Sequence, residues 1–200
     1  MLTKENRLSN QFFRKNPLKE VSSAIIAHYA IEMKLNEKLN QMISDIVSPD
    51  IDPQRKEKVL QERMHLEQLS DPAELTEFVR KGYDILNQHL LCKKILSQEE
   101  QVIPLLLKRY RTCSLDLFIE TTATILVHGK REYVQLLREM YDEIRSPYAQ
   151  AKACLVFGMC NMENEIPFLL KEYQRFQREY PTESFDQHPL LSLYLLHGKY

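Results

Sequence analysis

A short pattern that recurs in the second half of the chain constrains the fold more than any other feature. Residues 102–110 read Val-Ile-Pro-Leu-Leu-Leu-Lys-Arg-Tyr, and residues 165–173 read Glu-Ile-Pro-Phe-Leu-Leu-Lys-Glu-Tyr. Residues 133–141, between them, share the paired leucines, a following basic residue and the closing tyrosine, so the tyrosines lie 31 and 32 residues apart. A recurrence at this interval is typical of stacked helical units, each of which buries its apolar face against its neighbours.

The ends of these units recur as well. His-Gly-Lys occurs at 128–130 and again at 197–199, and Gly158 falls near the end of the middle unit. Glycine is a common left-handed C-cap, so each unit is predicted to read helix, turn, helix, glycine. The predicted units are 98–129, 130–159 and 163–198, with second helices at 115–128, 147–158 and 187–197.

Two Asp-Pro pairs mark helix starts in the first half of the chain. Asp52-Pro53 and Asp71-Pro72 each place a side-chain acceptor at the N-cap and a proline at the first helical position, where the missing N–H is harmless. These pairs predict antiparallel helices at 53–69 and 72–95. Ser146-Pro147 predicts the start of a later helix by the same reasoning.

Residues 1–47 are predicted to form a short helix at 4–15 and a long helix at 18–47. Pro17 and Ser48-Pro49 end these helices, because the residue before a proline avoids the helical region. The long helix carries an apolar stripe at alternating three- and four-residue steps. Its members are Leu35, Leu39, Met42 and Ile46.

Glycine is scarce, which favours helix over other structure. Four glycines in 200 residues leave few positions that can adopt positive φ, as tight turns and phosphate-binding loops require. The chain is therefore predicted to be all-α. Six leucines of the recurrent segments are expected in the core: Leu106, Leu107, Leu136, Leu137, Leu169 and Leu170.

Over residues 98–198 the chain resembles the HEAT-repeat family. The shared features are the first-helix prolines Pro104 and Pro167, the paired leucines and the two-helix unit length. The family's usual Asp at the inter-helix turn is missing, since residues 111–114 read Arg-Thr-Cys-Ser, and its basic residue inside the second helix is missing too. Tetratricopeptide repeats are the nearest alternative, but their Trp and Gly-x-x-Tyr positions are absent.

The resemblance implies a right-handed α-α superhelix of HEAT-like helical repeats at residues 98–200. The N-terminal helical region, residues 1–97, would pack on it, and the two regions would form one continuous domain. Such a fold also implies an extended surface that could be presented to a protein or peptide, because stacked helix pairs form one.

Charge disfavours a nucleic-acid partner. Lys and Arg total 27 against 28 for Asp and Glu, which gives a formal net charge of -1, whereas phosphate contacts call for a basic excess. A basic patch at Lys108, Arg109, Arg111, Lys130 and Arg131 has two interpretations: an anionic-partner site, or helix C-terminal cations on a solvated face. The second interpretation is favoured.

The sequence also bears on cellular location. No run approaches the roughly 20 apolar residues of a membrane span, and no apolar signal segment begins the chain. A cytoplasmic location is therefore expected, with no membrane contact. Cys92, Cys113, Cys154 and Cys160 show neither CxxC nor zinc-finger spacing, so reduced structural thiols are expected.

No arrangement of residues predicts catalysis. Glu62 and His65 have the Glu-x-x-His spacing of di-iron bundles, but none of the other histidines has a glutamate three residues before it. His28 and Glu32 have the spacing of a surface pair. Phosphate-binding, dinucleotide-binding and nucleophile-elbow motifs are absent. The prediction is a non-enzyme with no catalytic, metal-binding or cofactor-binding residues and no cofactor.

The leading hypothesis is a non-enzymatic protein–protein interaction or scaffold module that uses an α-solenoid surface to bind a protein or peptide. Two alternatives remain: a nucleic-acid-associated helical-repeat protein, and a structural homodimer through the long helix at 18–47. In the first unit, Leu115, Phe118, Ile119 and Leu126 are expected to be buried. The outward positions of the second helices are the predicted partner-binding residues: Asp116, Glu120, Thr124, Tyr148, Lys152, Gln187 and Tyr194.

Overall fold

The computed structural model describes residues 52–197, which belong to one compact unit at Ile46–Tyr200. The predicted helices at 4–15 and 18–47 lie outside the described residues. Within 52–197 the regular secondary structure is helical, with nine α-helices and no strand, so the all-α prediction is confirmed there. None of these helices combines the length and apolar character that crossing a bilayer requires.

The helices follow one another through short connections. The α-helices are α3 (Pro53–Gln68), α4 (Pro72–Lys81), α5 (Gln88–Leu96), α6 (Glu99–Tyr110), α7 (Asp116–His128), α8 (Arg131–Glu139), α9 (Pro147–Met159), α10 (Ile166–Glu179) and α11 (Gln187–His197). Short 3-10 turns precede or follow three of them: η1 (Ile85–Asn87), η2 (Tyr141–Glu143) and η3 (Glu163–Glu165).

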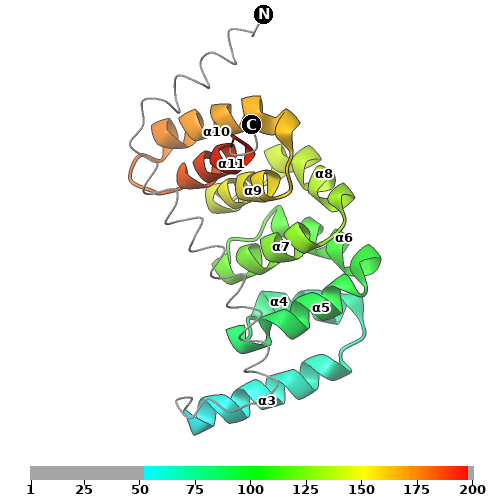
Figure 1. Ribbon diagram of the computed structural model, residues 1–200. Helices are drawn as coiled ribbons and strands as arrows, with labels where there is room; N and C mark the ends of the chain where they lie inside the picture. The colour runs from blue at the N-terminus through cyan, green and yellow to red at the C-terminus, as the bar shows by residue number, and fades with distance from the viewer. Residues whose placement is uncertain (1–51, 198–200) are drawn as a thin grey trace, which may run out of the picture. The chain divides into compact units, whose positions relative to one another are not determined.

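The helices from α4 onward form two rows (Figure 1). In the first row α4 contacts α6, and α6 contacts α8. Arg138 on α8 continues this row to α10, because its guanidinium lies 3.8 Å from the centroid of the Phe168 ring. In the second row α5, α7, α9 and α11 contact one another in that order. The recurrent segments therefore belong to the first row. Residues 102–110 lie in α6, residues 133–141 run from α8 to the start of η2, and residues 165–173 run from the end of η3 into α10.

Helix starts occur where the sequence places them. Asp52 accepts a hydrogen bond from the backbone N–H of Arg55 (3.3 Å), and Asp71 accepts from Ala73 and Glu74 (2.7 and 3.0 Å). Ser146 accepts from the N–H of Ala149 (3.3 Å) at the start of α9. Each cap precedes a proline at the first turn, and all three predicted starts are confirmed.

The predicted helix at 72–95 is wrong, because the chain breaks after Lys81. Gly82 adopts φ 85°, which ends α4, and the chain restarts through η1 before α5. Asp84 stabilises the restart: its carboxylate accepts from the N–H of Leu86 (3.1 Å) and from Arg55 Nε (2.8 Å). Two helices therefore replace one.

The core follows the recurrent tyrosines rather than the leucine pairs. Tyr110 and Tyr141 are buried, and so is the leucine four residues before each of the three tyrosines: Leu106, Leu137 and Leu169. Leu136 lies five residues before Tyr141, just as exposed Leu105 lies five residues before Tyr110. The Leu136 side chain is 44% exposed. The prediction that Leu136 is buried is wrong.

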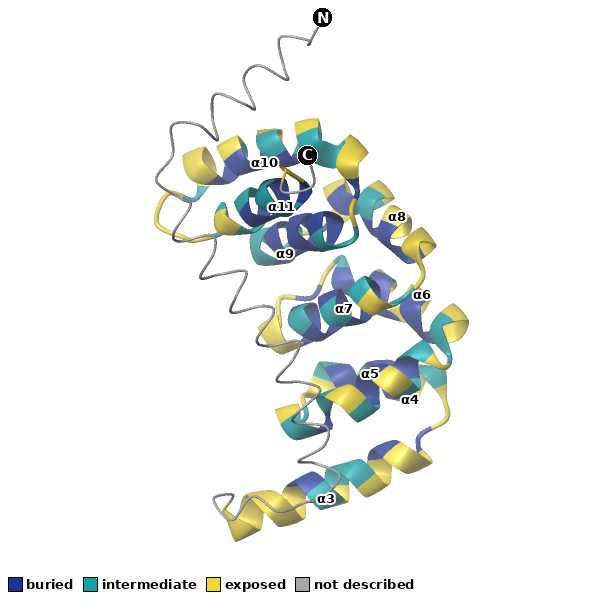
Figure 2. Cartoon of the chain, viewed as in Figure 1, coloured by how far each residue is buried: buried dark blue, intermediate teal, exposed yellow. Residues whose placement is uncertain are grey.

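The other core predictions have mixed outcomes. Leu107 is buried as expected, whereas Leu170 is only half-buried. Phe118, Ile119 and Leu126 form the buried side of α7, but Leu115 is exposed, because it precedes α7 as its N-cap residue. Figure 2 shows buried residues gathered between the rows and exposed ones on the outer sides of the helices.

Gly129 and Gly158 do not act as the predicted left-handed caps, and Gly198 lies outside the described residues. Gly129 ends α7 with φ -85° and ψ -174°, and Gly158 lies inside α9. Past α9, Asn161 adopts the left-handed conformation with φ 56°. Gly158 allows a close approach instead, since a Cβ there would lie 2.5 Å from Cα of Ser192 on α11.

Candidate functional site

Three of the predicted partner-binding residues meet between α7 and α9. Lys152 Nζ lies 2.6 Å from Glu120 Oε1, and Tyr148 Oη donates a hydrogen bond to the same oxygen. Tyr148 and Lys152 occupy one side of α9, four residues apart, and Glu120 faces them from α7. We call these three residues, together with His188 of α11, the α7–α9–α11 cluster.

His188 extends the cluster to the third helix. Its ring meets Tyr148 edge-on at 6.0 Å between centroids, and Lys152 Nζ lies 5.8 Å from the Tyr148 centroid. Burial, reinforced by the Lys152 charge, lowers the pKa of His188 to about 4, so the imidazole is neutral near pH 7. Its Nδ1 is buried, and within residues 52–197 no hydrogen bond satisfies it.

The burial of Lys152 corrects one sequence prediction. Its side chain was expected to point outward, but only 6% of it is exposed, because it turns into the contact with Glu120. A buried ammonium needs a compensating anion, and Glu120 supplies one. The contact therefore fixes α7 against α9, and Lys152 itself offers little surface to a partner.

The other four predicted residues do not join this group as one surface. Asp116 and Gln187 are exposed at the first positions of α7 and α11. Thr124 is half-buried and donates to the backbone carbonyl of Glu120 (3.0 Å), as helical threonines often do. Tyr194 is half-buried on α11.

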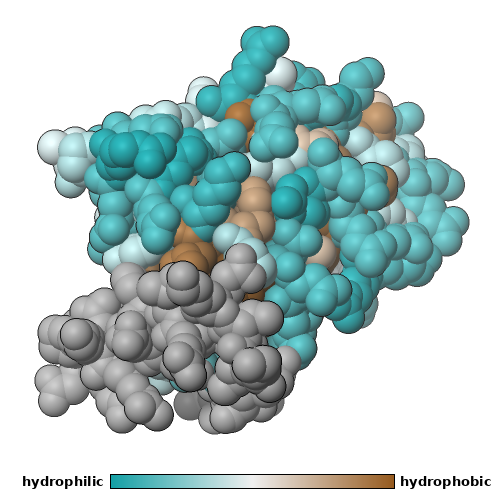
Figure 3. Space-filling view, turned by 90° about the horizontal axis from the view of Figure 1, so that it is seen from above, coloured by the Kyte–Doolittle hydropathy of each residue, from teal (hydrophilic) through white to brown (hydrophobic). Residues whose placement is uncertain are grey.

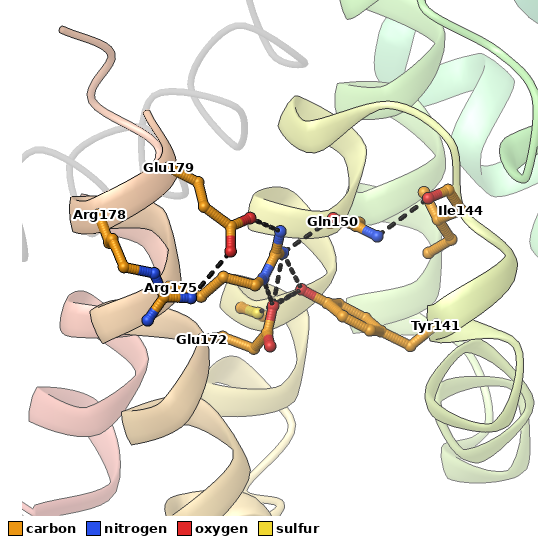
Figure 4. Close-up of polar contacts among 8 residues, drawn as sticks. Tyr141, Ile144, Gln150, Glu172, Arg175, Arg178 and Glu179 are labelled. Carbon is orange, nitrogen blue, oxygen red and sulfur yellow. Dashed lines mark hydrogen bonds and ion pairs between the residues drawn. The ribbon is translucent and has the colours of Figure 1, made fainter. Parts of the chain in front are cut away.

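A second polar network, which the sequence did not predict, joins η2, α9 and α10 (Figure 4). Tyr141 Oη donates to Glu172 Oε2 (2.7 Å), and Arg175 Nη2 lies 2.6 Å from the same oxygen. Arg175 also donates to Gln150 Oε1 (2.8 Å). The Glu172–Arg175 spacing normally indicates a surface pair, so only the burial beside Tyr141 distinguishes it.

This network is suited to holding helices rather than to chemistry. Glu172 and Tyr141 are buried, and burial raises the pKa of the Tyr141 hydroxyl above its ordinary value, so it stays protonated and donates. Cys154 lies 3.5 Å from Tyr141 Oη, and burial raises the pKa of its thiol to about 12. A thiol that remains protonated is a poor nucleophile.

The predicted basic patch is largely neutralised by neighbouring acids. Arg109 pairs with Glu77 (3.5 Å), and Arg111 pairs with Glu143 (2.7 Å). Lys130 lies within 3.0 Å of two carboxylates, Glu99 and Glu100, while Arg131 Nη2 donates to the carbonyl of Asn161 (3.3 Å). These contacts tie successive helices together.

Glu62 and His65 do not assemble a metal site. Glu62 accepts from the backbone N–H of Asp84 (2.8 Å), and the His65 ring lies 6.0 Å from that of Phe78. Across residues 52–197 no three His, Cys, Asp or Glu side chains are grouped so that they could hold a metal ion. The four cysteines are free thiols.

Exposed apolar side chains gather where α7 begins. Leu115 and Leu117 are exposed on either side of exposed Asp116. The Gly82 backbone approaches Leu117, since a Cβ built at Gly82 would lie 3.5 Å from Leu117 Cδ2, and Ile85 is exposed three residues after Gly82. We call Ile85, Leu115, Asp116 and Leu117 the α7 patch. Elsewhere apolar residues reach a mostly hydrophilic surface in separate patches, as Figure 3 shows for one face.

Comparison with known proteins gives no assignment. No family model, curated protein or solved structure matches this chain. The side chains described above are therefore the basis for proposing a function.

Proposed function

We propose that this protein is a non-enzymatic protein–protein interaction module, built as a HEAT-like α-solenoid, and that the α7 patch contacts its partner. The two rows of helices support the solenoid part of the proposal, since stacked helix pairs produce an extended surface. The α7–α9–α11 cluster and the network of Tyr141, Glu172 and Arg175 support the non-enzymatic part, since most of their hydrogen-bond donors and acceptors are paired with side chains of neighbouring helices.

The exposure of the α7 patch is the observation that carries the proposal. Isolated surface leucines are ordinary, but Leu115 and Leu117 are exposed on either side of acidic Asp116, and Gly82, which lies close to Leu117, is three residues before exposed Ile85. Burying the exposed half of each apolar side chain would contribute roughly 1 kcal/mol. Asp116 adds charge selection and favours a partner segment that combines apolar side chains with a Lys or Arg.

Of the seven residues predicted from sequence to bind a partner, Asp116 lies within this patch. Gln187 is exposed at the start of a different helix. Glu120, Tyr148 and Lys152 support the patch indirectly, because their contact fixes α7 against α9. The charge pairing across the basic patch gives the nucleic-acid alternative no support, and the homodimer alternative rests on residues outside the described range.

The test is affinity capture with the full chain and matched variants. Leu115→Ser with Leu117→Ser removes the apolar contacts while leaving the buried side of α7 intact, and Asp116→Lys reverses the charge. Met64→Ser is the control, because Met64 is exposed on α3 outside the patch. We expect a partner that wild type and Met64→Ser retain and that both patch variants lose. Equal capture by all four proteins would refute the assignment of the patch.

A further inference from the structure

The last residue of α4 adds a base beside the α7 patch. The Gly82 backbone lies against Leu117 in the first turn of α7. The next residue, Tyr83, places its Oη 2.7 Å from Thr121 Oγ1, one turn further along α7. Lys81 directly precedes these contacts and is exposed, so the surface around Leu117 combines a base from α4 with the acid and the exposed leucines of α7.

Lys81 and Asp116 differ from the charged residues around them in having no partner among residues 52–197. Both are exposed, and neither side chain takes part in an ion pair or hydrogen bond with another described residue. Nearby arginines, by contrast, pair with acids of the same chain: Arg80 and Arg109 with Glu77, and Arg111 with Glu143. Lys81 and Asp116 also do not pair with each other, so both charges are available to a second molecule.

A surface with this composition is complementary to itself. In a two-fold symmetric dimer, each contact between the copies occurs twice with the roles exchanged. Asp116 of one copy therefore faces Lys81 of the second copy, and Lys81 of the first faces Asp116 of the second. Leu117, which follows Asp116 and lies against Gly82, would be buried beside these ion pairs.

We propose that the partner bound by the α7 patch is a second copy of this chain, held by two reciprocal Asp116–Lys81 ion pairs beside Leu115 and Leu117. This inference rests on the proposed function, which favours a partner segment that combines apolar side chains with a Lys or Arg. Residues 81–85 present that combination, since Lys81 and Ile85 are both exposed. The patch is small, and interfaces below about 1,200 Å² are typical of transient association, so the dimer is expected to be weak.

Analytical ultracentrifugation of the full chain tests self-association directly. We expect the average mass to rise toward that of a dimer between about 10 µM and 1 mM protein, the concentration range of weak complexes. Leu115→Ser with Leu117→Ser should remain monomeric across that range. Met64→Ser, the exposed control on α3, should behave as wild type. A wild-type protein that stays monomeric throughout would overturn the proposal.

Two charge reversals give a sharper test, because each alone spoils both ion pairs. Asp116→Lys sets lysine against lysine at each contact, and Lys81→Asp sets aspartate against aspartate. Each variant should therefore dimerise at least about tenfold more weakly than wild type. Mixed in equal amounts, the two variants should form a heterodimer about as tightly as wild type, since every lysine then faces an aspartate. Circular dichroism of each variant checks that it folds.

The mixing experiment separates this dimer from other assemblies. A dimer that neither reversal weakens would use another surface, such as the helix predicted at 18–47, and would overturn the proposal. Mixed variants that stay monomeric would overturn it as well. A monomeric wild type whose α7 patch still captures a different protein would contradict the second-copy partner alone. The same monomer with capture that no patch variant alters would contradict the proposed function too.

Discussion

Gly158→Ala tests the close contact between α9 and α11. The new Cβ would lie 2.5 Å from both Cα and Cβ of Ser192 and 2.7 Å from its Oγ, whereas ordinary contacts begin near 3.4 Å. The nearest of these atoms is backbone, so relief requires the helices to separate. Such overpacking costs about 1 to 3 kcal/mol, and we expect the upper end of that range.

The sign of the effect makes the test decisive. Near the end of a helix without a tight neighbour, replacing glycine by alanine stabilises by up to about 1 kcal/mol. Here we expect destabilisation by about 3 kcal/mol and a Tm lower by about 6 to 12 °C, measured by thermal denaturation followed by circular dichroism. A stabilised Gly158→Ala variant would refute the proposed packing of α9 on α11.

A second substitution checks the mechanism. Ser192→Gly removes two of the three clashing atoms, but it also removes the hydrogen bond that Ser192 Oγ donates to the carbonyl of Cys154 (2.7 Å). Gly158→Ala should therefore cost less in the Ser192→Gly background than in wild type. An unchanged cost would indicate that the Ser192 Cα, which remains in Ser192→Gly, is the obstructing atom and not the Ser192 side chain.

Three further predictions follow from burial and pKa. Leu137→Ala should lower the unfolding free energy, measured by urea denaturation, by about 2 to 5 kcal/mol, because Leu137 is buried. Leu136→Ala should change it by less than about 0.5 kcal/mol. Equal costs would refute the assignment of the buried leucine as the one four residues before each tyrosine. The pKa of His188 is about 4 in the folded protein against an ordinary 6.5, so the unfolded chain gains a proton first as pH falls. The free energy of unfolding should therefore fall from about pH 6.5 toward pH 4. His188→Gln should flatten this loss, and an unchanged pH profile in that variant would contradict the prediction. Half-buried Cys160 should react first with dithionitrobenzoate, while Cys92 and Cys154, whose pKa values burial raises to about 12, should react only on unfolding; rapid labelling of Cys154 in the folded protein would contradict its position.

Local chemistry allowed the helix starts to be predicted from sequence. Asp71 and Ser146 act through atoms within three residues of themselves, so no tertiary information is needed. The break at Gly82 was missed because a single glycine is compatible with a continuing helix. Asp84 caps the restart locally through the N–H of Leu86, and its pairing with Arg55, 29 residues away, is the part that the sequence does not indicate.

The wrong predictions of which side chains face the core have a common cause. Contacts with residues on other helices decide the orientation, and the local sequence pattern does not reveal them. Leu136 and Leu137 look alike in a leucine pair, and the position of buried Tyr141 decides which of them faces the core. Lys152 was expected to be exposed because lysine side chains usually are. It is buried because it pairs with Glu120 on the adjacent helix. The Glu172–Arg175 network was missed for the same reason, since its third member, Tyr141, lies about one unit earlier.

Hydrogen–deuterium exchange on the full chain, with and without the protein captured through wild type, tests the central claim most directly. If the α7 patch contacts the partner, binding should slow exchange at residues 82–87 and 114–120, the segments that carry Ile85, Leu115, Asp116 and Leu117. Exchange in α3 should be unchanged. Protection that appears only outside both segments would contradict the proposal that this patch is the interaction surface.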